Sequence, residues 1–116
     1  MCATHSFGAL GRPAEVVLVL DTGATTSLIN MDLLTRLGYD PAATTDRVQV
    51  LTGGGVRILP RLVLSRLTVL GQDRIDFPVL SDALPPGADI DGVLGLDFFR
   101  GQVLTLDFRN GLVTLS

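Results

Sequence analysis

Apolar residues fall into short runs along the chain, separated by turn-forming residues, and this pattern is typical of β-strands. The run at 15–20 contains five consecutive valines and leucines, which predicts a central strand buried on both faces. Polar and apolar residues alternate over 47–50 and again over 56–58, with three glycines at 53–55 between them. This arrangement predicts a hairpin with an unusually flexible tip.

The same kind of pattern predicts two further hairpins. The first joins 61–70 to 74–80, and the second joins 103–108 to 112–115 through an Asn-Gly turn. Asn-Gly is a strong hairpin signal because both residues tolerate the positive φ that a tight turn requires.

Two short helices are expected to interrupt the strands. Asn30 is a suitable N-cap for a helix over 31–37, and Gly38 is a suitable residue to end it. Asp97 is expected to cap a second helix of a turn or two, which would reach Gln102.

Length and composition narrow the class of protein. The chain has 116 residues, the size of one domain, and 47% of them are apolar, which is enough to build a core. We therefore expect a single all-β domain over 1–116 with one or two short helices. The net charge is −3 and the nine arginines are scattered singly, which argues against a nucleic acid partner. No apolar run is long enough to span a bilayer, so we expect a soluble protein with no membrane partner.

Cysteine and histidine are too scarce for most metal and nucleophile chemistry. Cys2 and His5 are the only residues of their types, and no nucleophile motif accompanies them. A single cysteine allows neither an internal disulfide nor a multi-cysteine metal site. We therefore expect no metal and no cofactor. The first residues lack the basic and apolar regions of a signal peptide, so a cytoplasmic location is expected.

The candidate chemistry lies where the predicted strand at 15–20 ends. There the apolar run meets Asp21-Thr22-Gly23. A carboxylate in this position would lie at the floor of a cleft, and a second carboxylate beside it would allow the two to share one proton. One group then activates a water molecule for attack on a peptide carbonyl, while the other stabilises the oxygen on which charge develops. The hydroxyl group of Thr22 and the small size of Gly23 suit a loop in which the backbone approaches the carboxylate closely.

A second segment supports this interpretation. Residues 91–99 place the apolar pair Val93-Leu94 before Gly95 and, after one further residue, Asp97 and two phenylalanines. We expect the phenylalanines to lie in the core rather than in a substrate pocket.

Together the two segments resemble the retroviral-type (retropepsin-like) aspartic peptidases, particularly their bacterial and cellular members. In that family an apolar-Asp-Thr/Ser-Gly-Ala loop supplies one catalytic aspartate per subunit, and an apolar-apolar-Gly-x-Asp segment packs behind it. Residues 18–24 match the first motif and residues 93–97 match the second. The resemblance implies an acid protease barrel that works as a homodimer, with a flap at about 50–56 that closes over bound peptide.

The resemblance also implies roles for individual residues. Asp21, one from each subunit, would be catalytic, with Thr22 and Gly23 in support. The substrate would contact the loop after the aspartate and the flap, at Ala24, Thr25, Leu51, Thr52, Gly53, Gly54 and Gly55. The second aspartate would come from a second copy, because Asp91-Gly92 lacks the hydroxyl residue and the preceding apolar strand. The implied function is an aspartic endopeptidase that hydrolyses peptide bonds.

Two departures from the family pattern leave other functions open. Retroviral members often carry arginine at the position of Leu96 and an acid at the position of Thr26, so an ion pair that braces the dimer is missing. One alternative is a catalytically weak or inactive module of the same fold that dimerises or binds peptides. Another is an all-β ligand-binding domain in which Asp21 is an ordinary turn residue. The intact Asp-Thr-Gly and the glycine-rich hairpin favour the enzyme, because a scaffold needs neither.

Overall fold

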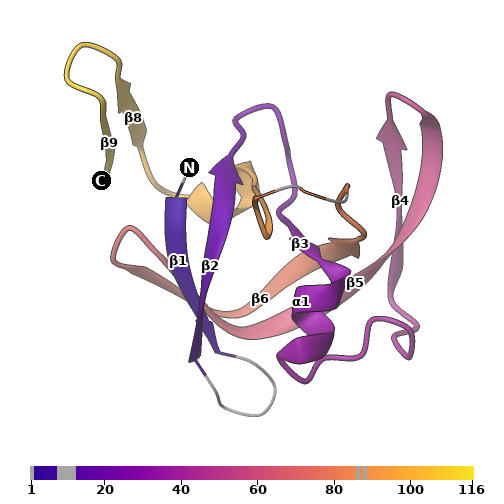
Figure 1. The fold of residues 1–116 in the computed structure, drawn as a ribbon. Coiled ribbons are helices and arrows are strands. Elements are labelled where there is room, and N and C mark those ends of the chain that lie inside the picture. Colours follow the sequence, from indigo (N-terminus) through magenta and orange to yellow (C-terminus); the bar gives the residue numbers. More distant parts are fainter. Residues whose placement is uncertain (1, 8–12, 86, 88) are drawn as a thin grey trace.

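The computed structural model describes residues 2–7, 13–85, 87 and 89–116, and it describes only the backbone for 2–7, 13 and 52. The side chains of Cys2 and His5 therefore lie outside the description. The protein consists mostly of β-strands, with one short α-helix and one turn of 3-10 helix, which confirms the predicted all-β fold with short helices (Figure 1). In chain order the elements are β1 (Cys2–Phe7), β2 (Pro13–Leu20), β3 (Leu28–Asn30), α1 (Met31–Arg36), β4 (Arg47–Thr52), β5 (Gly55–Val69), β6 (Gln72–Asp82), β7 (Gly92–Leu94), the 3-10 helix η1 (Leu96–Phe99), β8 (Leu104–Asp107) and β9 (Leu112–Leu115).

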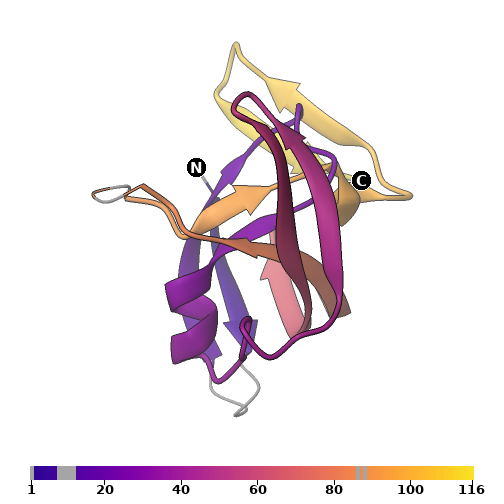
Figure 2. The same ribbon diagram turned by 90° about the vertical axis from the view of Figure 1, so that its right-hand side faces the viewer.

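Seven of the strands form one curled sheet in the order β1-β2-β7-β3-β6-β5-β4. Most neighbours are antiparallel, while β7 runs parallel to β2 and β6 runs parallel to β3. β1 makes a second, short pairing of three residues with β5, behind it in Figure 1. The sheet is nevertheless not closed into a barrel, which corrects the barrel that the family resemblance implies. β4 pairs only with β5 among the described strands and stays an open edge, because it extends outward with the first part of β5 as a hairpin, which faces the viewer in Figure 2.

The predicted hairpins are present, but two of them share one long strand. β5 runs without a break for 15 residues and pairs first with β4 and then with β6. Pro60 lies where β5 changes partners, opposite Arg47 at the first position of β4. A proline is tolerated at such a point because its missing N–H removes no bond from the middle of a ladder. The strand can therefore carry the outer hairpin and still belong to the sheet.

Strand β2 fills the core from one side only. Val16 and Leu18 are buried, whereas Val17 and Val19 are half-buried. The alternation corrects the prediction of a strand buried on both faces, because the outward side of β2 is only partly covered.

The two phenylalanines of the second motif lie in the core, as predicted. Phe98 is fully buried and packs edge to face against Phe77 and Phe99, with ring centroids 5.6 Å and 5.3 Å apart. Aromatic pairs in this geometry stabilise a core beyond the area that they bury. The segment behind the Asp21 loop is thus anchored by its aromatic side chains.

Helix α1 begins and ends close to where the sequence predicts. The side chain of Asn30 accepts a hydrogen bond from the backbone N–H of Asp32 at 3.1 Å, which confirms the N-cap. Gly38 has a φ of 95°, a conformation that favours glycine, and the helix ends before it. No helix in the described part of the chain is long and apolar enough to cross a membrane.

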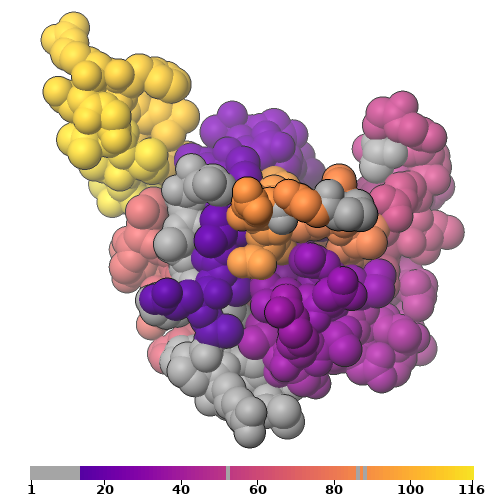
Figure 3. All heavy atoms as spheres, viewed as in Figure 1, coloured from indigo at the N-terminus to yellow at the C-terminus, as the bar shows by residue number. Residues whose placement is uncertain are grey.

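The β8–β9 hairpin is a separate two-stranded sheet that projects from the body (Figures 1 and 3). Its turn is closed by Asp107, which accepts hydrogen bonds from the side chain of Asn110 and from the backbone N–H groups of Asn110 and Arg109. These bonds, that of the Asn110 side chain foremost, hold the pKa of Asp107 below its usual range. A hairpin of this kind is marginal by itself, so its exposed edges invite a partner.

Gly92 sits where β7 passes closest to β3. A Cβ atom at this position would lie 2.1 Å from the carbonyl oxygen of Leu28 and 3.0 Å from the Cα atom of Ile29. Both obstacles are backbone in the middle of the sheet, so neither can move without disturbing the pairing of β3 with β7.

We therefore expect Gly92→Ala to lower the free energy of unfolding by about 3 kcal/mol, as overpacking of a core does. Gly53→Ala is the matched control, because Gly53 lies at a hairpin tip with nothing within 4 Å of the added methyl group. Its effect should stay below about 1 kcal/mol. Urea unfolding of both variants measures the difference, and equal midpoints would contradict the close approach at Gly92.

Candidate active site

Asp21 follows the last residue of β2, and its backbone is fixed on both sides. Its N–H donates to the carbonyl oxygen of Leu94 at 3.0 Å, and its carbonyl oxygen accepts from the N–H of Ala24 at 3.1 Å. The first bond continues the pairing of β2 with β7, and the second closes a tight turn. The position of the aspartate is therefore set by backbone hydrogen bonds.

The carboxyl group of Asp21 is exposed at the surface of this turn. Its Oδ1 atom accepts a hydrogen bond from the N–H of Gly23 at 2.9 Å, and its Oδ2 atom has no protein partner among the described residues. A Cβ atom on Gly23 would lie 3.2 Å from Oδ1, so the glycine allows the backbone to approach the carboxylate. Thr22 is also exposed. The loop thus presents one carboxylate oxygen to the outside of the molecule.

Behind the turn, Ser27 and Asp97 join the loop to the second motif. Asp97 accepts hydrogen bonds from the backbone N–H of Ser27 at 3.1 Å and 3.0 Å, and from the Ser27 hydroxyl at 2.7 Å. The Ser27 oxygen, fully buried, accepts in turn from the N–H of Gly95 at 3.0 Å. The prediction that Asp97 caps a helix is therefore wrong. Its side chain does not cap η1, because its oxygens accept hydrogen bonds from a loop 70 residues earlier in the chain.

Gly95 is required at this junction by the space available. A Cβ atom there would lie 2.9 Å from the carbonyl oxygen of Ala24 and 2.9 Å from the carbonyl carbon of Thr26. The next residue, Leu96, donates its N–H to the same oxygen of Ala24 at 2.8 Å. The glycine of the second motif thus lets the two segments touch backbone to backbone.

Asp91 has a structural role that the sequence did not reveal. Its carboxylate accepts from the N–H of Val17 at 2.7 Å, and its own N–H donates to the carbonyl oxygen of Val17 at 2.7 Å. Its carbonyl oxygen accepts from the N–H of Asn30 at 2.7 Å. Asp91 therefore ties β2 to β3, and no local signal distinguishes it from an ordinary turn aspartate.

A cleft of about 610 Å³ lies between the Asp21 loop and the β4–β5 hairpin, which stand apart in Figure 3. Of the residues expected to contact substrate, Ala24, Thr25 and Leu51 line it. Gly53 and Gly54 form the turn of the hairpin with Gly55 beginning β5, and among the described residues these three do not line the cleft. The backbone of Thr52 ends β4, and its side chain lies outside the description. Val50, at the start of the predicted flap, also lines the cleft. The lining missed by sequence reasoning is Thr26, Leu28, Val48, Gln49, Leu59, Leu80 and Asp82.

An ion pair joins the outer hairpin to the body at the edge of this cleft. Arg57 of β5 donates two hydrogen bonds to the carboxylate of Asp82, at the end of β6, and the bond from Nη2 measures 2.8 Å. The same carboxylate accepts from the N–H of Ala83 at 2.8 Å. Asp82 is largely buried, at 13% side-chain exposure, so the pair is shielded more than a typical surface ion pair.

Two comparisons with known proteins find matches, one to a family and one to a fold. The sequence profile of the family described as aspartyl protease matches residues 9–98. Among solved structures, a retropepsin-like aspartic protease from Rickettsia conorii matches with a TM-score of 0.67 and 17% sequence identity. That match covers 99% of this chain and 89% of the Rickettsia chain. A search of curated protein sequences finds no significant match.

Two buried serines allow the junction behind Asp21 to be tested. Ser27→Ala should lower the free energy of unfolding by about 2 kcal/mol, because it leaves the N–H of Gly95 without an acceptor and Asp97 without one donor. Ser81 is equally buried, but its hydroxyl has no hydrogen-bond partner among the described residues. Ser81→Ala should therefore change that free energy by less than about 0.5 kcal/mol. Chemical denaturation compares the two, and similar losses would show that the Ser27 network contributes nothing specific.

Proposed function

Because the chain belongs to the aspartyl protease family and has the fold of a retropepsin-like protease, we propose that it is an endopeptidase whose active site forms when the Asp21 residues of two copies meet. The observation that carries the proposal is the exposed carboxylate of Asp21, which has one oxygen without a protein partner among the described residues. It lies in a turn whose following residues, from Gly23 to Thr26, line the cleft. The bonds that fix its backbone leave the side chain available for chemistry.

In the proposed mechanism, two Asp21 carboxyl groups share one proton across a two-fold axis. The ionised group takes a proton from a water molecule, whose oxygen attacks the carbonyl carbon of the scissile peptide bond. The protonated group gives its proton to the carbonyl oxygen, which neutralises the charge that develops there. The group that took the proton from water then gives it to the amide nitrogen, while the other group takes a proton from a hydroxyl of the tetrahedral intermediate, and the carbon–nitrogen bond breaks. Thr22 and Gly23 support the carboxylates from each copy.

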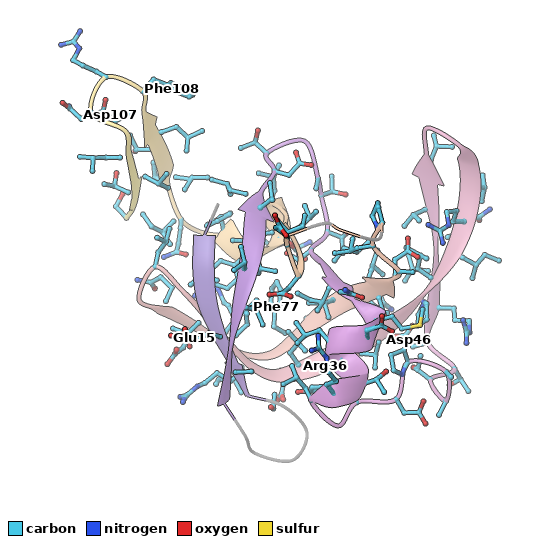
Figure 4. All side chains as sticks on the ribbon, viewed as in Figure 1. Glu15, Arg36, Asp46, Phe77, Asp107 and Phe108 are labelled. Carbon is cyan, nitrogen blue, oxygen red and sulfur yellow. The ribbon has the colours of Figure 1, made fainter. Side chains whose placement is uncertain are left out.

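A second copy is needed because the sequence holds a single Asp-Thr-Gly. The β8–β9 hairpin is a surface suited to bind this copy. The projecting β8–β9 hairpin carries exposed apolar side chains at Val103, Phe108 and Leu112, and Phe108 is 91% exposed (Figure 4). Exposed apolar groups gathered on a two-stranded sheet are unfavourable in water and favour burial against a partner. A two-fold dimer, the commonest arrangement for identical chains, would bury both hairpins at once.

The β4–β5 hairpin is proposed to act as the flap over a bound peptide. Leu51 is exposed on it and lines the cleft, so a peptide bound there would give Leu51 apolar contacts. The Arg57–Asp82 pair ties the middle of the hairpin to the body, while the glycines at the tip leave that end able to move. An extended peptide could also add backbone hydrogen bonds to these strands.

Asp21→Asn should abolish peptide cleavage, with a loss of about 1,000-fold or more, because an amide cannot exchange the proton. The dimer should persist, since the side chain makes no described hydrogen bond beyond the turn. Asp32→Asn, an equivalent change of an exposed aspartate on α1, should keep activity. The measurements are cleavage of an unfolded protein between about pH 4 and 7 and sedimentation velocity. Unchanged cleavage by Asp21→Asn would refute the proposed aspartic peptidase function. An unaltered dimer that binds peptide but never cleaves it would favour the peptide-binding alternative.

Phe108→Ser should weaken the dimer about tenfold or more, since an exposed aromatic side chain at the centre of an interface contributes strongly to binding. Activity per chain should then fall on dilution at concentrations where the unaltered protein remains active. Val63→Ser removes an exposed apolar side chain from β5, outside the hairpin, and should leave the dilution profile unchanged. Full activity of a stable monomer would contradict the shared active site.

A further inference from the structure

A second cavity, of about 360 Å³, lies next to the cleft, and Thr26 lines both. Thr26 belongs to the loop between Asp21 and β3, so the second cavity adjoins the part of the cleft beside this loop. Three arginines from different elements line it, namely Arg61 of β5, Arg74 of β6 and Arg100 after η1. In a chain whose net charge is −3, this is a local concentration of positive charge.

The three arginines differ in how far their charge is already balanced. Arg61 makes two hydrogen bonds to the carboxylate of Asp46, at 2.8 Å and 3.1 Å, and this partner raises the pKa of Arg61. Arg74 has neutral partners instead, the carbonyl oxygens of Phe98 and Asp73 and the side chain of Gln102.

The guanidinium of Arg74 also lies over the ring of Phe98, 4.5 Å from its centroid. The ring and the hydrogen bonds hold the group in place without cancelling its charge. Arg100 is exposed and has no carboxylate partner in the described residues. Two positive charges at this cavity are therefore unmatched.

One carboxylate, that of Asp97, also lines the cavity and opposes the entry of an anion. Both of its oxygens accept hydrogen bonds from Ser27, which disperse its charge into the loop. The remaining lining includes Phe77 and Pro78, whose apolar surface suits the aliphatic stem of a long side chain. The cavity thus combines an apolar floor with cationic walls.

We propose that this cavity is a subsite for an acidic side chain of the substrate, bound by Arg74 and Arg100, and that it makes the enzyme prefer peptides with a glutamate at one position away from the scissile bond. The inference rests on the proposed peptidase function and adds a substrate class to it. Arg74 is held rigidly and provides a fixed donor, while Arg100 can reach the carboxylate from the open side.

The test uses fluorogenic peptides of one cleavable sequence, in which a glutamate is moved one position at a time and each peptide is paired with its glutamine counterpart. At pH 6 the glutamate is ionised. At one position the ratio of kcat/KM for glutamate over glutamine should be about two- to fivefold, through KM, and should decline as salt is added. Arg100→Gln, which leaves Arg74 in place, should bring this ratio closer to 1.

Arg36→Gln is the matched control, because it removes the same charge from α1, which lines neither the cleft nor the second cavity (Figure 4). It should keep the ratio of the unaltered protein. A ratio near 1 at every position, or equal loss in both variants, overturns the subsite.

Binding separates this subsite from the proposed catalysis. The same labelled peptide pairs are titrated against the Asp21→Asn protein by fluorescence anisotropy. Tighter binding of the glutamate peptide, lost on adding Arg100→Gln, supports the subsite even where the unaltered protein cleaves nothing. Equal binding of both peptides overturns it even where cleavage is efficient.

Discussion

The hydrogen bonds between Ser27 and Asp97 hold the loop that carries Asp21 against the segment behind it. This network is partly buried, and it is completed by the N–H of Gly95, whose missing side chain leaves room for the backbone of the loop. At its other end the loop is tied to Leu94 through the backbone of Asp21. Because the loop is fixed at both ends by groups other than the aspartate side chain, the carboxylate keeps a free oxygen without losing its position.

The strands and turns could be predicted from the sequence because they depend on local patterns. Alternation of apolar residues, the Asn-Gly turn and the cap at Asn30 each act within a few residues, and the structure contains all three. The continuity of β5 through Pro60 and the open sheet could not be predicted in this way. They depend on which distant strands pair, and a single sequence holds no direct record of pairing.

The same distinction between local patterns and contacts of distant segments applies to the candidate site. The Asp21 loop carries a motif, so its residues could be named in advance. Asp97 was expected to cap a helix because its neighbours allow that, yet its actual partner lies 70 positions away. Asp82 and Arg57 come from the ends of different strands and meet only through the fold. Function placed on loops by a distant scaffold is the part that local reasoning reaches least.

Charge around the cleft is distributed unevenly, although the net charge of the chain is small. On the hairpin side, Arg57 is matched by Asp82, so that wall is close to neutral. On the side of Thr26, the charges of Arg74 and Arg100 are unmatched. A charged peptide responds to this local field more than to net charge, because the walls of a cleft focus it. The orientation of a bound peptide would therefore follow from the side on which its acidic residue lies.

The proposed mechanism also explains why a catalytic aspartate should be exposed in a single chain. In a single chain the exposed carboxylate has no second carboxylate with which to share a proton, and solvent is not excluded from it. A second copy would supply both conditions at once, so activity would follow the population of dimer by mass action. Leu96 occupies the position where retroviral relatives often carry arginine, and the β8–β9 hairpin offers apolar side chains instead of charges. Association built on apolar contacts is weakly screened by salt, whereas binding at the arginines is strongly screened. Raising the ionic strength should therefore weaken the preference for an acidic substrate at salt concentrations that leave the dimer intact.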